Sequence, residues 1–387
     1  MRLPPPYDAH YGVHVAPPAT ELALPPEAIR SIQAAAAALA GLNAVVAARP
    51  SAYHVTRVLV RDEATRSSAI EGTQATLDEL LSADAVLEGT GDLEHGAGTR
   101  DELETVRAYA VALERFLARP HPIDAAVISG LHRAVFTGSA EFADGRHGRP
   151  GAWREKTVWI GSGRDISRST FNPPPHPLVP GLIEEHVGWL RDTEEGTMAP
   201  ATPIRLALAH AHFEAIHPFA EGNGRVGRML LSLMLAAEGH VAVPLSRVLD
   251  RRRSDYYEAL KLAQQKLDFV PLSLLMCDAI QESAEQARDL DERLSLMPAS
   301  WRDPARWPAG RPPRRDGAAS RMLDVLPYHP VVTTGLVERE LEVSGQAANL
   351  AVAALAAAGI LVERTGYRRN RVFVCPEALA AIVGGEA

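Results

Sequence analysis

HPFAEGNGRVGR, residues 217–228, is the stretch of this chain that decides its fold. Upstream of it, Pro203–Ile216 has apolar residues at helical spacing and a proline near its start. Downstream, Arg225–Ala237 has the same periodicity. The stretch therefore predicts a buried helix, a glycine-rich turn and a second helix, which favours a mainly α fold.

The turn in this stretch has the composition of a phosphate-binding site. Gly222, Asn223 and Gly224 interrupt the helical pattern and suit a backbone with positive φ or a close approach to a ligand. A glycine-rich turn that opens a helix points free N–H groups and the positive end of the helix dipole at an anion. Arg225 and Arg228 lie three residues apart, so both guanidinium groups can reach one anion.

A carboxylate and a histidine complete the predicted site. Mg²⁺ takes one or two carboxylates plus phosphate oxygens, so Glu221 is the predicted magnesium ligand, with Mn²⁺ as an alternative. His217 can accept a proton near neutral pH. A single histidine at a helix end usually packs or is solvated, but here several roles converge. A zinc protease is excluded because HExxH is absent and His212 faces a different side of the helix from His217.

A second group of residues lies upstream, in RSSAIEGTQ, residues 66–74. Ser67 and Glu71 are four residues apart and share one face of a helix, which Gly72 ends or kinks. Taken alone, the pattern is more typical of a helix end with a capping serine and a solvated glutamate.

Both stretches resemble motifs of the Fic family of protein-adenylylating enzymes. Residues 217–228 are similar to the signature HPFx[DE]GNGRxxR at every specified position, and Ser67, Glu71 and Gly72 are similar to the inhibitory motif [ST]xxxE[GN]. The resemblance implies a Fic-type helical core that binds Mg-ATP as substrate. Such a core transfers AMP to a Tyr, Thr or Ser hydroxyl of a target protein, or of the chain itself, and releases diphosphate.

The resemblance also implies a role for each residue of the signature. His217 would deprotonate the incoming hydroxyl, and Glu221 would hold Mg²⁺ against the α- and β-phosphates. The Gly222–Gly224 backbone and Arg225 would hold the phosphates, and Arg228 would bind the γ-phosphate. Most relatives have Asp where this chain has Glu221, so its metal preference or basal rate is expected to differ.

The inhibitory motif implies that Glu71 forms a bidentate ion pair with Arg228 and excludes the γ-phosphate. A reversed use of the same site remains open, in which Glu71 positions a water that hydrolyses AMP from a modified protein. A third hypothesis is a DNA-binding regulator with a nucleotide-sensing pocket.

Weaker matches extend the predicted site. Thr157–Ile160 has a β-like pattern that ends at Gly161 and resembles the family's flap, a short β-hairpin that holds the target by added-strand pairing. A surface hairpin without a ligand is an equal alternative. Tyr257 and Gln264 match family positions that contact the adenosine, although aromatic and amide residues on a helix more often lie in the core or on the surface. The residues expected to face nucleotide or target are Val158, Trp159, Ile160, Gly161, Tyr257 and Gln264.

We predict four segments: an N-terminal helical region with the inhibitory helix (1–100), the catalytic core (101–296), a Pro- and Arg-rich linker (297–317) and a winged helix-turn-helix (318–387). The N-terminal half is predicted to form the helices Pro26–Ala48, Tyr53–Glu71, Leu77–Leu87, Glu102–Ala118 and Ile123–Phe136.

The C-terminal segment has the pattern of a winged helix. Its predicted elements are the helices Ser320–Leu326, Thr334–Leu341 and Gln346–Ala358 and the strands Ile360–Glu363 and Arg371–Val374. The predicted wing is basic through Arg364, Arg368, Arg369 and Arg371. The would-be recognition helix has no cation and offers only Gln346 and Asn349 to bases. DNA binding and a packing or homodimerisation role therefore both stay open.

Composition agrees with a globular intracellular enzyme. The net charge is −8, with 46% hydrophobic and 23% charged residues, which argues against general nucleic-acid affinity. Cys277 and Cys375 show no disulfide or metal spacing, so we expect a cytoplasmic location. The N-terminus has no signal-peptide core, and the apolar run Ala34–Ala48 is too short to span a membrane, so no membrane partner is expected.

Overall fold

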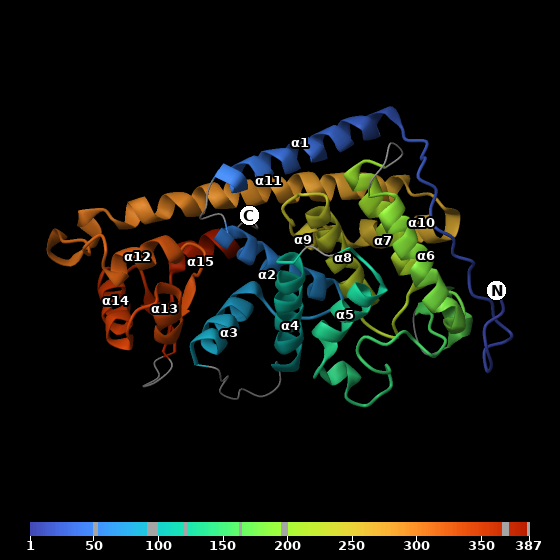
Figure 1. Cartoon of the computed structure of the whole chain (residues 1–387), viewed down its shortest axis with the longest axis horizontal. Helices are drawn as coiled ribbons and strands as arrows, with labels where there is room; N and C mark the ends of the chain where they lie inside the picture. The colour runs from blue at the N-terminus through green and yellow to red at the C-terminus, as the bar shows by residue number, and fades with distance from the viewer. Residues whose placement is uncertain are drawn as a thin grey trace.

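Two long helices, α1 (Pro26–Ala48) and α11 (Val270–Trp301), lie side by side along one edge of the molecule (Figure 1). The computed structural model describes residues 1–48, 53–90, 100–119, 122–161, 165–194, 200–365 and 371–384. The fold is mainly α, with a short antiparallel hairpin and a small C-terminal sheet, as predicted from the sequence.

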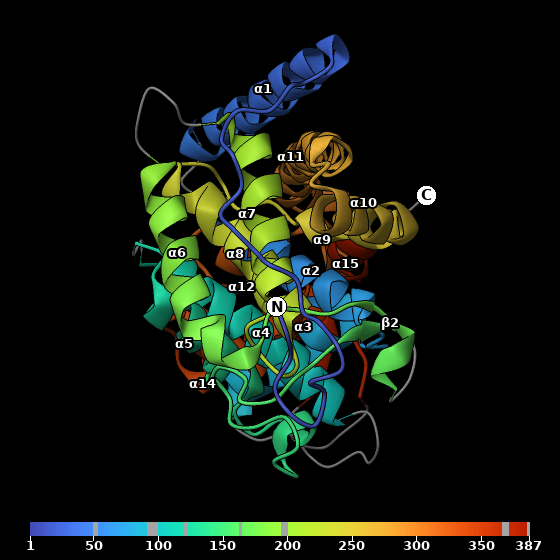
Figure 2. The ribbon, with the colours of Figure 1, turned by 90° about the vertical axis from the view of Figure 1, so that its right-hand side faces the viewer.

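Helix α7 (Thr202–Ile216) is the central element of the fold. Every residue from Pro203 to Ile216 is buried, because α6 (Val179–Asp192), α8 (Asn223–Ala237) and α11 all pack against it. Figure 2 shows α7 between α6 and the α8–α9 region. This burial explains why α7 has no polar face, and it fixes the position of the turn that joins α7 to α8.

The N-terminal half supplies four further helices beside this core. They are α2 (Tyr53–Ile70), α3 (Leu77–Thr90), α4 (Arg100–Leu117) and α5 (Ala125–Phe136). Asp124 caps α5 by accepting a hydrogen bond from the Val127 backbone N–H at 2.7 Å. Helix α2 ends one residue before the prediction, at Ile70, and Gly72 follows with φ of 98°. Two shorter helices, α9 (Leu245–Arg251) and α10 (Arg253–Lys266), follow α8.

The predicted strand Thr157–Ile160 is wrong in most of its length. Strand β1 contains only Ile160–Gly161, which pairs antiparallel with β2 (Ser169–Phe171) through an irregular register. A strand needs hydrogen-bonding partners, and β2 is only three residues long. Trp159, just before β1, instead packs edge-on against Tyr7 of the N-terminal segment, with ring centroids 5.5 Å apart.

The predicted linker begins too early. Helix α11 continues through Trp301, so residues 297–301 are helical. Trp301 and Trp307 are both buried, and the Trp307 indole N–H donates to the Trp301 carbonyl at 2.8 Å. The Pro- and Arg-rich segment is therefore partly packed into the hydrophobic core rather than being a solvated spacer throughout.

The C-terminal part contains each predicted helix and strand. The helix Thr334–Leu341 has the predicted bounds, and the ends of the others are shifted. Two elements are present that the sequence did not indicate. The helices are α12 (Ala318–Val325), α13 (Thr334–Leu341) and α14 (Gly345–Ala357), and the strands are β4 (Val362–Glu363) and β5 (Val372–Val374). The additional elements are β3 (Val331–Thr333) and α15 (Pro376–Val383). The sheet order is β3-β5-β4, with antiparallel pairs.

The C-terminal part packs on α3, the helix that follows α2 in the chain. Arg364 of the predicted wing donates two hydrogen bonds of 2.7 Å to Asp78 on α3. Arg371 pairs with Glu363 within the wing. The predicted phosphate contacts Arg368 and Arg369 lie outside the described residues.

Helix α1 is long and apolar enough to cross a membrane when only length and composition are considered. Its most apolar window has a mean hydropathy of 1.6, and 17% of that window is buried. The 23-residue helix is longer than the apolar run considered from the sequence. Core helices of globular proteins also meet this criterion, and α1 packs along α11.

Buried histidines make the fold sensitive to acid. Burial is the main cause that lowers the pKa of His132, His212 and His217 to about 4 and that of His210 to about 3, and it lowers the pKa of His186 well below its ordinary value. These side chains are neutral in the folded state at pH 5, whereas an unfolded chain protonates them below their ordinary pKa of about 6.5. Folding therefore releases protons, and stability is lost as the pH falls below about 6.5.

Two buried carboxyl groups act in the opposite direction. Burial raises the pKa of Glu63 to about 7 and that of Glu214 to about 8, so both are protonated in the fold at pH 5.5. Five histidines against two carboxyls leave roughly three net protons, or about 4 kcal/mol per pH unit at most. We expect the unfolding midpoint to fall steeply between about pH 6.5 and 4.5, as measured by denaturant titration. A flat profile across this range would contradict the assigned protonation states.

Candidate active site

The turn between α7 and α8 is held in an unusual conformation. His217 ends α7 with φ of 51°, a left-handed value. The buried Arg154 fixes this turn, because its Nε donates to the His217 carbonyl at 2.7 Å and its backbone N–H donates to the Pro218 carbonyl at 2.9 Å. Arg154 carries no signal in the sequence motif, yet it positions the predicted base.

Gly222 is required at the start of α8. Its φ is 81°, and a Cβ atom at this position would lie 2.4 Å from the ring of Phe136. We expect Gly222→Ala to lower the free energy of unfolding by about 1–3 kcal/mol, because it adds both left-handed strain and a ring clash. Denaturant titration measures this loss, and Gly239→Ala is the matched control because its φ is also positive but it has open space around it. Equal losses in the two variants would refute the clash.

Asn223 braces the turn with its side chain. Its Oδ1 accepts from the Phe219 backbone N–H at 2.8 Å, and its Nδ2 donates to the Phe219 carbonyl at 2.9 Å. The side chain is almost fully buried. The predicted nucleotide contact at Asn223 is therefore restricted to its backbone, and the side chain shapes the loop.

Arg228 and the end of α2 form the main electrostatic contact of the site. The Arg228 Nη2 donates to the Glu71 Oε1 at 2.6 Å and to the Ser67 carbonyl at 2.9 Å, and its Nε donates to the Ser67 Oγ at 2.8 Å. The guanidinium is 2% exposed. The predicted pairing partner of Arg228 is therefore right, but its geometry is not bidentate: one bond reaches Glu71, and Ser67 takes two others.

Glu71 also lies against the first turn of α8. A Cβ atom added to Gly224 would come within 2.3 Å of the Glu71 Oε1. Burial by itself raises the pKa of Glu71, but the charge and hydrogen bond of Arg228 outweigh burial and hold that pKa below its ordinary value. An ionised carboxylate thus sits where the helix dipole and Arg228 favour an anion.

Arg225 is also engaged by a carboxylate. Its Nη1 and Nη2 donate to the two carboxylate oxygens of Glu141 at 2.9 and 2.6 Å, and its guanidinium lies 4.4 Å from the centroid of the Phe136 ring. The side chain of Arg225 is 4% exposed. Glu141 would have to move before the Arg225 guanidinium could bind a phosphate. The sequence did not indicate Glu141 as a partner of Arg225.

Glu221 offers the most suitable metal ligand of the turn. Its side chain is 44% exposed, and its Oε1 accepts from the Gly222 backbone N–H at 3.0 Å. In the described ranges, no three His, Cys, Asp or Glu side chains are grouped closely enough to hold a metal ion. One exposed carboxylate suits Mg²⁺ that takes its remaining ligands from phosphate and water.

His217 is neutral at pH 7, which is the protonation state that a general base requires. Burial, assisted by the positive charge of Arg154, lowers its pKa to about 4, so the ring is neutral at pH 7. Its Nδ1 has no hydrogen-bond partner among the described residues and lies 3.9 Å from the Glu214 carboxylate. Burial raises the pKa of Glu214 to about 8, so this neighbour is mostly a neutral acid at pH 7.

One cavity of about 440 Å³, here called the active-site cavity, brings several of these side chains together. The predicted residues that line it are Glu71, Ile160, His217, Gly224, Arg228, Tyr257 and Gln264. Lining residues that sequence reasoning missed are Thr170, Phe171, Glu214, Tyr256, Leu260, Lys261 and Gln265.

Other predicted residues do not line the active-site cavity. They are Ser67, Gly72, Val158, Trp159, Gly161, Glu221, Gly222, Asn223 and Arg225. Of the predicted flap, Ile160 is the residue that reaches the cavity, because the hairpin begins later than expected.

Comparisons with known proteins match two parts of the chain. Residues 29–117 match the model of the Fic/DOC family N-terminal region, and residues 122–235 match the Fic/DOC family model. A probable protein adenylyltransferase of Aquifex aeolicus is 36% identical over 122 residues, covering 29% of this chain and 35% of that protein. The protein adenylyltransferase fic-1 of Caenorhabditis briggsae is 30% identical over 200 residues, covering 50% of this chain and 35% of that protein. The chain thus matches about a third of the length of these curated relatives.

Solved structures share the fold. A Fic family protein from Desulfovibrio desulfuricans G20 has a TM-score of 0.55 at 20% identity, covering 94% of this chain and 98% of that chain. Fic-1 from C. elegans has a TM-score of 0.51 at 21% identity, covering 69% of this chain and 73% of that chain.

Proposed function

The chain belongs to the Fic/DOC family, and on that premise we propose that it is an autoinhibited protein adenylyltransferase. The reaction transfers AMP from Mg-ATP to a Tyr, Thr or Ser hydroxyl of a target protein or of the chain itself. The observation that carries this proposal is the active-site cavity, which His217 and Arg228 border and in which Glu71 binds Arg228.

His217 has the properties that the transfer needs. In the proposed reaction the target oxygen attacks the α-phosphorus, the bond to the bridging oxygen breaks, diphosphate leaves and His217 takes the hydroxyl proton. A neutral imidazole is required for this role, and the lowered pKa supports it. Arg154 holds the backbone of His217 and thereby fixes the position of the base.

Glu221 would hold Mg²⁺, with phosphate oxygens and water completing the coordination. The metal ion, when bound, would neutralise phosphate charge. Backbone N–H groups at the start of α8 would face the phosphates, because Gly222 precedes that helix as its N-cap residue and Asn223 and Gly224 begin its first turn. Tyr257 and Gln264 line the same cavity and would contact the adenosine.

Glu71 would inhibit the enzyme by occupying the γ-phosphate position. Its carboxylate is ionised, binds Arg228 and contacts the anion-favouring first turn of α8, as a phosphate would. Since Ser67 binds the same guanidinium, the end of α2 holds Arg228 through three hydrogen bonds. ATP and Glu71 would therefore compete for one cation.

A de-AMPylating hydrolase is the second candidate, and one observation favours it. Glu71 and His217 line one cavity, so a carboxylate and a base could together orient a water toward a bound AMP-protein. For the DNA hypothesis, Arg364 and Arg371 of the proposed winged helix are both paired with carboxylates, which weakens their availability for phosphate.

Labelled ATP distinguishes these functions. Adenylylation transfers label from the α-phosphate of ATP to protein and none from the γ-phosphate. We expect α-label in protein bands when Glu71→Gly is incubated with cell lysate and Mg-ATP. Transfer of γ-label would indicate phosphorylation instead, and release of AMP from a pre-modified protein would favour the hydrolase.

A further inference from the structure

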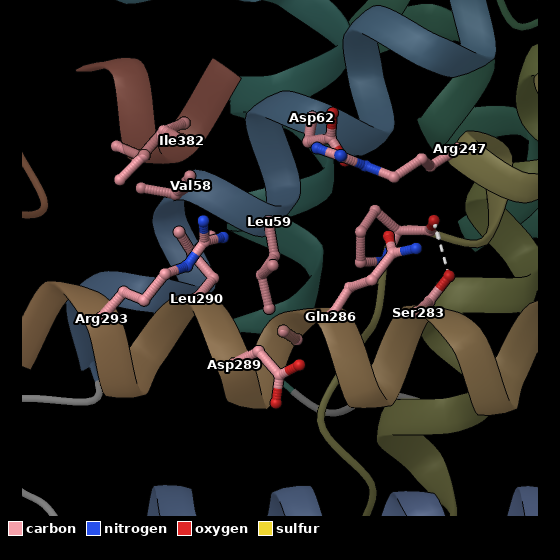
Figure 3. Close-up of a pocket in the computed structure, with 13 residues that line it drawn as sticks. Val58, Leu59, Asp62, Arg247, Ser283, Gln286, Asp289, Leu290, Arg293 and Ile382 are labelled. Atoms are coloured by element: carbon pink, nitrogen blue, oxygen red, sulfur yellow. Dashed lines mark hydrogen bonds and ion pairs between the residues drawn. The ribbon is translucent and has the colours of Figure 1, made fainter. Parts of the chain in front are cut away.

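A second cavity lies between α2, α9, α11 and α15, with a volume of about 200 Å³ (Figure 3). It shares no lining residue with the active-site cavity. We call it the α2–α11 cavity. One wall is α2, the helix whose C-terminal end leads to Glu71, so an occupant would contact the proposed inhibitory helix directly.

Helix α11 gives this cavity two chemically different ends. Gln286, Leu290 and Arg293 are spaced four and three residues apart, so they share one helix face. Gln286 and Arg293 are separated by two turns, about 10 Å along the axis. Figure 3 shows Leu59 of α2 extending toward α11 between these two ends.

The Gln286 end carries buried acceptors that need a donor. The Gln286 Oε1 and the Asp62 Oδ1 are both buried, and neither has a hydrogen-bond partner among the described residues. Asp62 is 2% exposed, and its Oδ2 accepts from the Arg247 Nε at 2.8 Å. A buried acceptor without a partner is costly, so a ligand that donates a hydrogen bond here would relieve that cost.

The donor at this end should be neutral. Asp62 already faces two cations, with Arg247 bonded to it and the Arg66 Nε 3.7 Å from its Oδ1. A third cation beside the same carboxylate would be repelled by both arginines. A hydroxyl group fits better, since it can donate to Gln286 or Asp62 and accept from Arg247.

The opposite end attracts an anion. Arg293 is exposed at the cavity rim and forms no ion pair with any residue in the ranges that the structure covers. Asp289, which also lines the rim, pairs with the neighbouring Arg288 at 3.7 Å. A carboxylate at this end would meet the Arg293 guanidinium, while Figure 3 shows the Asp289 carboxylate on the opposite side of the α11 ribbon.

The middle of the cavity is apolar. Its walls there are the side chains of Val58, Leu59, Leu290 and Ile382. We propose that the α2–α11 cavity binds a small elongated hydroxycarboxylate, with its carboxylate on Arg293, its alkyl or aryl body between Leu59 and Leu290, and its hydroxyl on Gln286 and Asp62. The small volume excludes nucleotides and larger cofactors.

Such a ligand would regulate the enzyme, and this consequence rests on the proposed function. The cavity is formed with α2 in the position that pairs Glu71 with Arg228. A ligand that binds this state better than one with α2 displaced shifts the population toward it. Occupancy would therefore strengthen the inhibition and lower the rate of AMP transfer.

Binding of defined probes by the full-length chain tests the site without reference to activity. Isothermal titration calorimetry would compare 6-hydroxyhexanoate, which has both polar ends, with hexanoate, which lacks the hydroxyl. We expect 6-hydroxyhexanoate to bind about tenfold more tightly, because its hydroxyl satisfies a buried acceptor. We also expect 6-aminohexanoate to bind less tightly than 6-hydroxyhexanoate.

Two substitutions test which residue binds the hydroxyl end of the ligand and which binds its carboxylate end. Gln286→Leu should remove the preference for the hydroxyl, and Arg293→Ala should weaken both carboxylates about two- to fivefold. Gln281→Leu is the matched control for Gln286→Leu, since Gln281 lies on the same helix but does not line the cavity, and its affinities should equal those of wild type. No measurable binding of 6-hydroxyhexanoate to the wild type, or binding that both cavity variants leave unchanged, would overturn the proposal. Because the readout is binding, loss of this site is distinguishable from loss of the proposed enzyme activity.

Discussion

Replacing Glu71 by glycine is expected to raise the initial rate of AMP transfer by roughly 30-fold to several thousand-fold. The buried Arg228 would lose its carboxylate partner but keep its bonds to Ser67, so the Nη2 N–H that had bound Glu71 becomes free for the γ-phosphate. The rate is measured from incorporation of α-phosphate label into protein with saturating target or lysate.

One control variant and one further measurement make the Glu71 test specific. Glu27→Gly removes an exposed acid on α1 and should leave the rate unchanged. Glu71→Gly also leaves the buried Arg228 charge without its partner, so the unfolding midpoint of this variant should fall. ATP should raise the midpoint of the variant more than it raises that of wild type. An unchanged rate together with a lowered midpoint would mean that the Glu71–Arg228 contact is structural and not inhibitory.

Loss of the base is expected to have the second large effect. In the Glu71→Gly background, His217→Asn should lower the rate of AMP transfer by about 100- to 10,000-fold. Asparagine is preferable to alanine because residue 217 has φ of 51°, which asparagine tolerates better. ATP affinity should stay within about threefold, because Arg228 and the α8 turn are intact.

The pH profile gives an independent check on His217. With a pKa of about 4, the neutral base is present at all pH values above about 5, so the rate should not fall between pH 8 and 6 through this group. His240→Ala, beyond the far end of α8, is the control and should retain full activity. A rate that survives His217→Asn would place the base elsewhere in the cavity.

The sequence predicted those features that depend on local patterning. Both ends of α1, the C-terminal end of α7 and the αL glycine at 222 follow from periodicity or backbone chemistry. Ser67 and Glu71 lie on one side as predicted, although α2 ends at Ile70 and Glu71 is in the turn that follows it. Arg228 and Glu71 are 157 residues apart, and here the resemblance to a known motif supplied a partner that local patterning could not.

Features set by non-local contacts were missed. Glu141 binds Arg225 from 84 residues away, and Arg154 holds His217 from 63 residues away, without any local signal in the sequence. The hairpin was misplaced because its partner strand, β2, is only three residues long. Strand β3 was missed because it is three residues long and depends on pairing with β5.

Nucleotide affinity tests most directly whether Glu71 and the γ-phosphate compete for Arg228. Binding of Mg-ATP and Mg-ADP would be measured for wild type and Glu71→Gly, both carrying His217→Asn to prevent turnover. ADP lacks the γ-phosphate, so the account predicts that Glu71→Gly tightens ATP binding by about tenfold or more while ADP changes little. Equal gains for ATP and ADP, or no gain for either, would contradict the proposed competition.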